Sequence, residues 1–452
     1  MRGVRVMRLN KLSKALLAGS LIIVMGASVV GCGNKQVEAT PNGGQAQGNT
    51  SAEKVEVEIF QFKVEISEAL QKAAELYMAE HPNVTINLQT VGGGDDYGAA
   101  LKAKFQSGQE PTIFNVGGPQ DVADWQEKLE DLSDQSWVER AGSTLGAVTS
   151  DNKIYGMPYG VEGYGIVYNK AIFEAAGIDA TTIVDTASMD KAFAQLDAKI
   201  KAGELKEQFP LLEAVVEMPV KEKWVTGLHS SNIFINQEFE TGVEAYNAKE
   251  IAFEKSKEFK EYFDLMVKYS ANSETPTKLN AIDYATQVGQ GLAIERVAAI
   301  QQGNWVYGDV KNVDENVAEN LGFLPVGGDS IPLGVPMYWA INSTQPDVEK
   351  AAAKDFLNWL YSSDEGKNIV VNEFFFVPPF TGYDNFPAQD ALGKEIMRFQ
   401  AEGKTTPWVF MGYPTAWGED TLGINLQKYV AGELSWEEVI EDAKAKWIEA
   451  RK

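Results

Sequence analysis

The chain has 452 residues, of which 44% are hydrophobic and 23% are charged. This length and composition support at least two globular cores and exclude a chain that is disordered throughout. The formal net charge of −24 disfavours binding to nucleic acids or to anionic lipid surfaces. With two histidines and one cysteine, the chain can build neither a disulfide scaffold nor a structural zinc cage, and we expect no metal and no cofactor.

The first 31 residues have the layout of a secretory signal. They contain five basic residues and no acidic one, and a mostly apolar run over 15–30 is too short for a confident membrane span. The run ends in Val29-Val30-Gly31-Cys32, which resembles a bacterial lipobox, where cleavage leaves a lipidated Cys32 at the new N-terminus. The alternative is a plain signal followed by an incidental cysteine.

Residues 32–54 are predicted to be a tether behind the lipidated cysteine. Their Gly, Asn, Gln, Thr, Ser and Pro content cannot bury a core. We therefore expect an extracytoplasmic protein that is lipid-anchored to the outer face of the bacterial cell membrane. Without residues 1–31 the chain has 35 basic and 64 acidic residues, a formal charge of −29.

From residue 55 onward, strand and helix patterns alternate. The expected elements are a strand at 55–60, a helix at 66–77, a strand at 84–88, a helix at 97–106 and a strand at 111–116. His81-Pro82 ends the first helix, and Gly117-Gly118-Pro119 ends the third strand. This rhythm predicts a first lobe built on a parallel sheet with helices on both faces.

The rhythm breaks at a Gly- and aromatic-rich stretch, 154–170, and a second, larger lobe is predicted beyond it. Its expected elements are helices at 189–202 and 251–269 and a strand at 321–325. Residues 346–361 have one apolar helical face, and Ser435 to Glu438 have the spacing of a capping box. No repeat of solenoid length is visible.

Several short motifs in this body resemble those of one protein family. The most specific are Tyr155-Gly156-x-Pro158, Val161-Glu162 and Tyr168-Asn169-Lys170. Supporting motifs are Gly303-Asn304-Trp305, Trp339-Ala340-Ile341-Asn342 and Ser363-Asp364-Glu365-Gly366. Over residues 55–452 the chain resembles the solute-binding lipoproteins of bacterial ABC importers, in the carbohydrate-binding family that includes maltose-binding protein.

The resemblance implies a two-lobe, periplasmic-binding-protein-like α/β fold with the ligand in a cleft between the lobes. Lobe 1 would comprise 55–160 plus 335–380, and lobe 2 would comprise 163–330 plus 386–452. Hinge segments would cross between them near 158–164, 330–336 and 378–388. The resemblance also implies a monomer.

A sugar site needs aromatic planes for the C–H faces and carboxylates or amides for the hydroxyls. By this resemblance, Glu162 stands at the position of the family's ligand-contacting glutamate, or alternatively is only a hinge residue. Trp305 stands at the position of the family's stacking tryptophan, or alternatively is only a buried indole. Lys63, Gln120 and Asp121 follow predicted strands, where open α/β sheets bind ligands. Further candidates are Glu213, Trp408, Tyr413, Trp417, Trp339 and Tyr164. Each can also be explained as a packing residue or as a loose match to the family pattern.

These features predict a non-enzymatic receptor that captures a sugar or oligosaccharide by hinge closure and delivers it to an ABC permease. A secreted glycosidase is an alternative, because it also needs aromatic residues and paired carboxylates. Acidic residues are too abundant here for one pair to stand out. A third interpretation is a binding protein for a peptide, a polyamine or a phosphate ester.

Overall fold

The computed structural model describes residues 54–92 and 95–452. The predicted signal segment, Cys32 and all but the last residue of the predicted tether lie outside the described residues. Within the described ranges, no helix combines the length and the apolar character that a membrane span requires.

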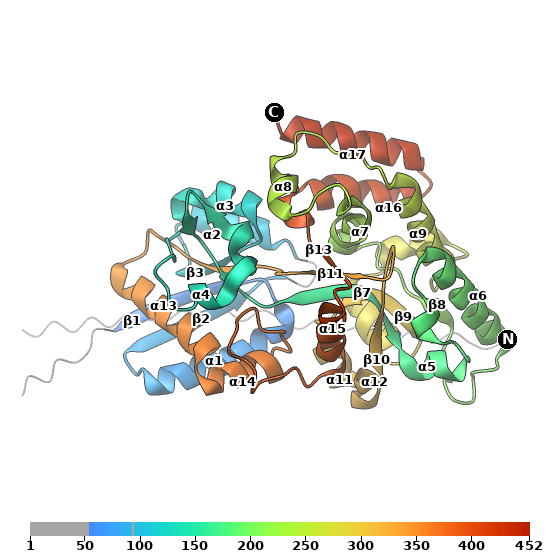
Figure 1. The fold of residues 1–452 in the computed structure, drawn as a ribbon, viewed down its shortest axis with the longest axis horizontal. Coiled ribbons are helices and arrows are strands. Elements are labelled where there is room, and N and C mark those ends of the chain that lie inside the picture. The colour runs from blue at the N-terminus through green and yellow to red at the C-terminus, as the bar shows by residue number, and fades with distance from the viewer. Residues whose placement is uncertain (1–53, 93–94) are drawn as a thin grey trace, which may run out of the picture. The chain divides into compact units, whose positions relative to one another are not determined.

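One sheet, whose strands β1 and β2 are blue in Figure 1, has the order β2-β1-β3-β12-β6. Its strands are β1 (Val55–Gln61), β2 (Val84–Thr90), β3 (Ile113–Val116), β6 (Met157–Pro158) and β12 (Tyr338–Ile341). β1 is parallel to β2 and β3, as predicted, whereas β12 is antiparallel to β3 and β6. The prediction of an entirely parallel sheet is therefore wrong for the later strands, because β12 enters from the other sheet and not through a βαβ crossover.

Helices cover both faces of this sheet, as predicted. Ile59 packs into a cluster with α1 and α13, whereas its neighbour Phe60 packs on the opposite face with α2 and α3, because successive strand residues point to opposite faces. The helices are α1 (Ser67–Glu80), α2 (Tyr97–Gln106), α3 (Pro119–Trp125), α4 (Val138–Ala141), α13 (Asp347–Ser362) and α14 (Asp364–Asn372). Short elements are η1 (Val64–Ile66), η2 (Gln126–Lys128), η3 (Gly142–Val148), β4 (Thr149–Ser150) and β5 (Lys153–Ile154). We call this sheet and its helices the first lobe.

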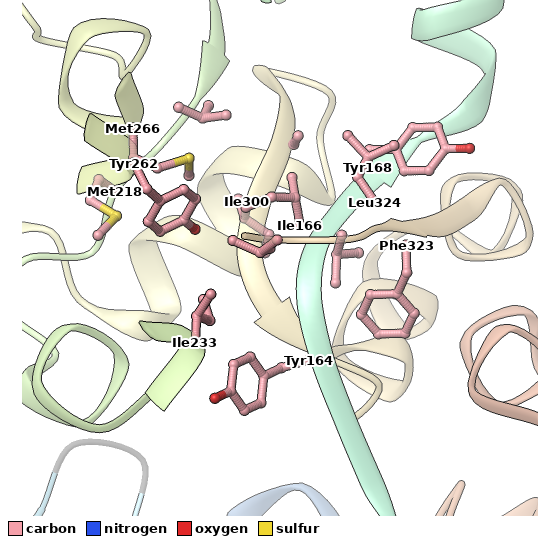
Figure 2. Close-up of a cluster of buried hydrophobic side chains, with 14 of the residues drawn as sticks. Tyr164, Ile166, Tyr168, Met218, Ile233, Tyr262, Met266, Ile300, Phe323 and Leu324 are labelled. Atoms are coloured by element: carbon pink, nitrogen blue, oxygen red, sulfur yellow. The ribbon is translucent and has the colours of Figure 1, made fainter. Parts of the chain in front are cut away.

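The second sheet is organised around β7, whose eight residues are all buried. Its strands are β7 (Glu162–Asn169), β8 (Ala214–Val216), β9 (Val297–Gly303), β10 (Leu321–Leu324), β11 (Ile331–Gly334) and β13 (Thr405–Pro407). β7 pairs with β9 along one edge, and with β10 and then β11 along the other. Figure 2 shows Tyr164 and Ile166 of β7 projecting into a core that also contains Tyr262 and Ile300.

Helices enclose this second sheet, and together they form the second lobe. They are α5 (Lys170–Ala175), α6 (Thr186–Ala202), α7 (Ser231–Ile235), α8 (Gly242–Asn247), α9 (Ser256–Lys268), α10 (Tyr284–Gln287), α11 (Val306–Val313), α12 (Glu315–Glu319), α15 (Ala391–Ala401), α16 (Ile424–Val430) and α17 (Trp436–Ala450). Short 3₁₀ turns are η4 (Ala180–Thr182), η6 (Pro276–Ala281) and η8 (Phe410–Gly412), and π-helical segments are η5 (Trp224–Ser230), η7 (Val288–Leu292) and η9 (Trp417–Gly423).

Two of the π-helical segments touch backbone to backbone. A Cβ atom on Gly227 of η5 would lie 1.9 Å from the carbonyl oxygen of Gly418 in η9, so this contact requires glycine. π-Helical turns are rare and occur often at functional sites. Here the contact fixes η5, which carries His229.

Three chain segments connect the two sheets, and hydrogen bonds hold them together. The first lies between β6 and β7, the second between β11 and β12, and the third between α14 and α15. Tyr159 N donates to Met337 O at 3.1 Å, and Val161 N donates to Val377 O at 2.8 Å. Glu162, which follows the first segment directly, therefore begins its strand at the junction of the two lobes.

The capping box predicted at Ser435 is present at the start of α17. The Ser435 hydroxyl accepts from Glu438 N, and the Glu438 carboxylate accepts from Ser435 N. We expect Ser435→Ala to lower the free energy of unfolding by about 1 kcal/mol, because a backbone N–H loses its partner. Urea denaturation would measure this, with Ser435→Thr as the control that retains a capping oxygen. An equal loss for both variants would contradict the capping role.

Candidate functional site

A buried ion pair joins the two lobes. Lys63 follows β1 of the first lobe, Glu162 begins β7 of the second, and Lys63 Nζ lies 2.8 Å from Glu162 Oε1. The side chains are only 4% and 2% exposed. The ammonium group and the carboxylate therefore form a close ion pair that is shielded from water.

Other carboxylates surround the same ammonium group. Burial by itself lowers the pKa of Lys63, but the charge of Glu162, followed by those of Glu65 and Asp309, raises that pKa above its ordinary value. Burial raises the pKa of Glu162, and Lys63 opposes this shift only in part. Burial also raises the pKa of Asp309, whose carboxylate accepts from Tyr284 OH at 2.7 Å. Lys63 is thus a protonated group among several acids.

Buried polar side chains of the first lobe hold Lys63 in place. Gln61 Oε1 accepts from Lys63 N at 2.6 Å and from Tyr159 OH at 2.8 Å, and Gln61 Nε2 donates to Lys63 O. Asn115 Oδ1 accepts from Phe62 N at 3.1 Å. Asn115 therefore supports the backbone of the Lys63 loop.

Three aromatic rings lie near the Lys63 ammonium group. Its Nζ lies 5.6 Å from the ring centroids of Phe62 and Trp305 and 5.8 Å from that of Phe376. At these distances the electron-rich ring faces attract a cation. We call these three rings and the Glu162 carboxylate the ammonium cage.

The Gly303-Asn304-Trp305 motif builds the second-lobe side of this cage. A Cβ atom on Gly303 would lie 2.0 Å from the Trp305 ring, so the indole can fold back over β9 only because residue 303 is glycine. Asn304 Oδ1 accepts from Gly163 N at 3.0 Å and ties β9 to β7. Trp305 Nε1 donates to Gln302 Oε1 at 2.9 Å, which fixes the ring. The motif therefore places Trp305 beside the ion pair of Lys63 and Glu162.

His229 is the centre of a second group of rings, which shares Trp305 with the cage. Its imidazole stacks on Tyr164 with centroids 4.3 Å apart and lies 5.4 Å from Trp305 and 5.7 Å from Trp408. Burial, and then the charge of Lys63, lowers the pKa of His229 to about 3, so the ring is neutral at neutral pH. The expected residues Tyr164, Trp305 and Trp408 thus meet around His229, which was not among our predicted ligand contacts.

Gln120 and Asp121 lie in α3, where the structure gives them other partners. Gln120 Oε1 accepts from Arg451 Nη1 at 2.7 Å, and Arg451 follows α17 of the second lobe. Asp121 Oδ2 accepts from Gly117 N at 2.6 Å within the first lobe. Asp124 Oδ2 accepts from Thr415 Oγ1 at 2.8 Å. Gln120 is therefore part of a second contact between the lobes, and we do not include it or Asp121 in the candidate site.

This α3 contact gives a prediction about lobe closure. Arg451→Met removes a hydrogen bond to Gln120 from a charged donor, worth about 1.5 kcal/mol. We expect the ratio of closed to open protein to fall by about tenfold, and small-angle scattering would detect this as a larger radius of gyration. Lys452→Met, at an exposed neighbour, is the control. If Arg451→Met and Lys452→Met have the same radius of gyration, the contact between Arg451 and Gln120 has no part in closure.

Four further expected residues are engaged in their own lobes. Glu213 is 55% exposed and pairs with Arg296. Trp339 has no exposed surface, stacks on Tyr159 with centroids 4.0 Å apart and donates to Tyr361 OH. The other two lie in the second-lobe core: Tyr413 OH is 3.3 Å from Ser231 Oγ, and Trp417 Nε1 donates to Ala443 O. Their polar atoms are satisfied inside each lobe, so in this arrangement they do not line the candidate site.

Comparison with known proteins extends this description. The sequence profile of the family described as bacterial extracellular solute-binding protein matches residues 63–367. The xylose/arabinose-binding protein XacG of Haloferax volcanii is 25% identical over 270 residues, which cover 58% of this chain; the chain spans 55% of the length of that relative.

Solved structures share the fold. A chitin oligosaccharide binding protein has a TM-score of 0.67 at 22% identity, over 88% of this chain and 99% of its own. The solute-binding protein RafE, in complex with raffinose, has a TM-score of 0.68 at 17% identity, over 88% of this chain and 100% of its own. The structure thus has the two-lobe α/β fold expected from the sequence, and the chain belongs to the bacterial extracellular solute-binding protein family.

Proposed function

We propose that this protein captures a sugar or oligosaccharide between its two lobes and delivers it to the permease of an ABC importer. The observation that carries the proposal is the buried contact of Lys63, Glu162 and Trp305 at the junction of the lobes. The relatives add support, because XacG is a xylose/arabinose-binding protein and RafE was solved with raffinose.

The chemistry of this junction suits a sugar. The Trp305 ring offers a plane for the C–H face of a pyranose, and the carboxylates of Glu162 and Asp309 can accept hydrogen bonds from hydroxyl groups. Tyr284 OH, which donates to Asp309, adds an acceptor oxygen beside it. A micromolar dissociation constant needs about −8 kcal/mol net, which one stacked ring and several charge-assisted hydrogen bonds can supply.

The protein's own side chains fill the junction in the described arrangement. Lys63 and Glu162 are almost completely buried, and Trp305 is 8% exposed. A ligand therefore reaches Glu162 only when the lobes separate and Lys63 moves away from it. This burial supports binding by lobe opening and closure.

We also propose a cell-surface setting for this receptor. Its family is extracellular. The lipobox-like sequence at Cys32 supports a lipid anchor, with the following residues as the tether. The lobe boundaries at 55–160 plus 335–380 and 163–330 plus 386–452 are part of the same proposal. Labelling with radioactive palmitate in the producing bacterium tests the anchor, and Cys32→Ala should abolish the label.

Isothermal titration against a saccharide library tests the proposed function. We expect at least one mono- or oligosaccharide to bind with a micromolar or lower dissociation constant, and the bound sugar to be recovered intact after prolonged incubation. Hydrolysis of the sugar would favour a glycosidase. Folded protein that binds no saccharide in the library would contradict the proposed function.

A further inference from the structure

The candidate site contains more negative than positive charge. Three carboxylates act on the Lys63 ammonium group, namely those of Glu65, Glu162 and Asp309. Three negative charges against one positive charge leave a formal charge of −2. His229 contributes no charge at neutral pH. These acids come from both lobes, because α11, which carries Asp309, contacts η1, which carries Glu65.

The ammonium cage is an independent observation that points to a cation. The centroids of its rings lie within 6 Å of Lys63 Nζ, as in sites that recognise ammonium ligands. The carboxylate of Glu162 is 2% exposed, and its Oε1 lies 2.8 Å from the same nitrogen. The cage therefore already holds one ammonium group, that of Lys63, between a carboxylate and aromatic rings.

Lobe opening separates Lys63, together with Phe62 and Phe376 of the first lobe, from the Glu162 and Trp305 side of the cage. Lys63 belongs to the first lobe, whereas Glu162, Trp305 and Asp309 belong to the second. After separation the carboxylates of Glu162 and Asp309 have lost their nearest cation, which is Lys63. When the lobes close again over a ligand that keeps Lys63 away, a neutral ligand leaves the buried Glu162 carboxylate without a cation, which is costly. A ligand that carries its own cation offsets this charge.

We propose that the captured saccharide carries a protonated amine, and that its ammonium group binds beside Glu162, Asp309 and the Trp305 ring. The ligand class is thus an amino sugar or an oligosaccharide that contains one. This inference rests on the proposed function and narrows it to one chemical class of sugar.

Matched sugars test the inference on the purified full chain. Glucosamine, N-acetylglucosamine and glucose differ only in the substituent at carbon 2. The corresponding galactose compounds differ in the same way, and the β-1,4-linked dimers of the glucose series differ at carbon 2 of each ring. We expect the amine to bind at least about tenfold more tightly than both neutral partners in one series. We also expect the affinity of the amine, but not that of the neutral sugars, to fall as the salt concentration rises.

The possible outcomes separate this inference from the proposed function. Neutral sugars that bind as tightly as the amines, or more tightly, overturn the inference and leave sugar capture intact. Binding of spermidine without binding of any saccharide overturns both. Failure of every probe to bind overturns both as well.

Charge-neutralising variants provide a second test. Asp309→Asn keeps the shape of the side chain and removes one negative charge, and we expect it to weaken amine binding about tenfold more than it weakens binding of a neutral analogue. Asp329→Asn, which changes the same charge at an exposed position, is the matched control. Glu65→Gln replaces Asp309→Asn if that variant does not fold. Equal losses for the amine and the neutral analogue would overturn the inference.

Discussion

Replacement of Glu162 by glutamine is expected to open the ligand-free protein and to weaken ligand binding by more than about 100-fold. Removing one member of a buried ion pair costs about 3–5 kcal/mol, because the remaining charge is left without a partner. Here that charge is the Lys63 ammonium group, which is 4% exposed. Separation of the lobes hydrates Lys63, so the cost appears mainly as a shift toward the open form.

Small-angle scattering and isothermal titration together measure this effect. The radius of gyration of ligand-free Glu162→Gln should increase, and its ligand affinity should fall. Glu213→Gln removes a carboxylate from an exposed ion pair and should change neither quantity. An unchanged radius and affinity for Glu162→Gln would show that the pair does not control closure.

A double variant separates the role in closure from the role in binding. Lys63→Met retains most of the apolar stem and removes the charge, so Lys63→Met/Glu162→Gln contains no unpaired buried ion. We expect the double variant to recover the smaller radius of gyration while ligand affinity stays low. Recovery of both the smaller radius of gyration and the ligand affinity would mean that Glu162 acts only through Lys63 and does not touch the ligand.

Replacement of Trp305 by alanine is expected to reduce both stability and binding. The ring is 8% exposed and contacts the His229 ring, so its removal leaves a cavity that costs about 3–5 kcal/mol of unfolding free energy. It also removes the plane on which the sugar would stack, so the folded variant should bind at least about tenfold more weakly.

Trp305→Phe distinguishes the two effects. Phenylalanine retains a ring face but not the hydrogen bond to Gln302, which costs about 1–3 kcal/mol because the Gln302 acceptor stays buried. We expect this variant to be less stable than the parent protein but to keep most of its affinity, measured by urea denaturation and titration. If Trp305→Phe and Trp305→Ala lose affinity equally, stacking is not the role of this ring.

The sequence patterns predicted local elements well where periodicity and flanking residues agree. The predicted helix 97–106 has the same bounds in the structure. The helix predicted at 251–269 begins only at Ser256, because Phe253 has a positive φ of 53° that a helix cannot contain. The antiparallel β12 could not be predicted locally, because its pairing depends on a segment that returns from the second lobe.

The candidate site was predictable only in part. Lys63, Glu162 and Trp305 were expected from strand ends and from family motifs, and they meet in the structure. The central place of His229 depends on the π-helical turn of η5 and its glycine contact, which leave no clear pattern in the sequence. Glu65 and Asp309 were hidden among 64 acidic residues, so composition could not single them out.

A crystal structure of the protein with the tightest-binding saccharide tests the central claim most directly. We predict electron density for the sugar against the Trp305 ring, with at least one hydrogen bond to the Glu162 carboxylate and with Lys63 displaced from its 2.8 Å contact. A sugar bound elsewhere, with the Lys63 to Glu162 contact intact, would contradict the account.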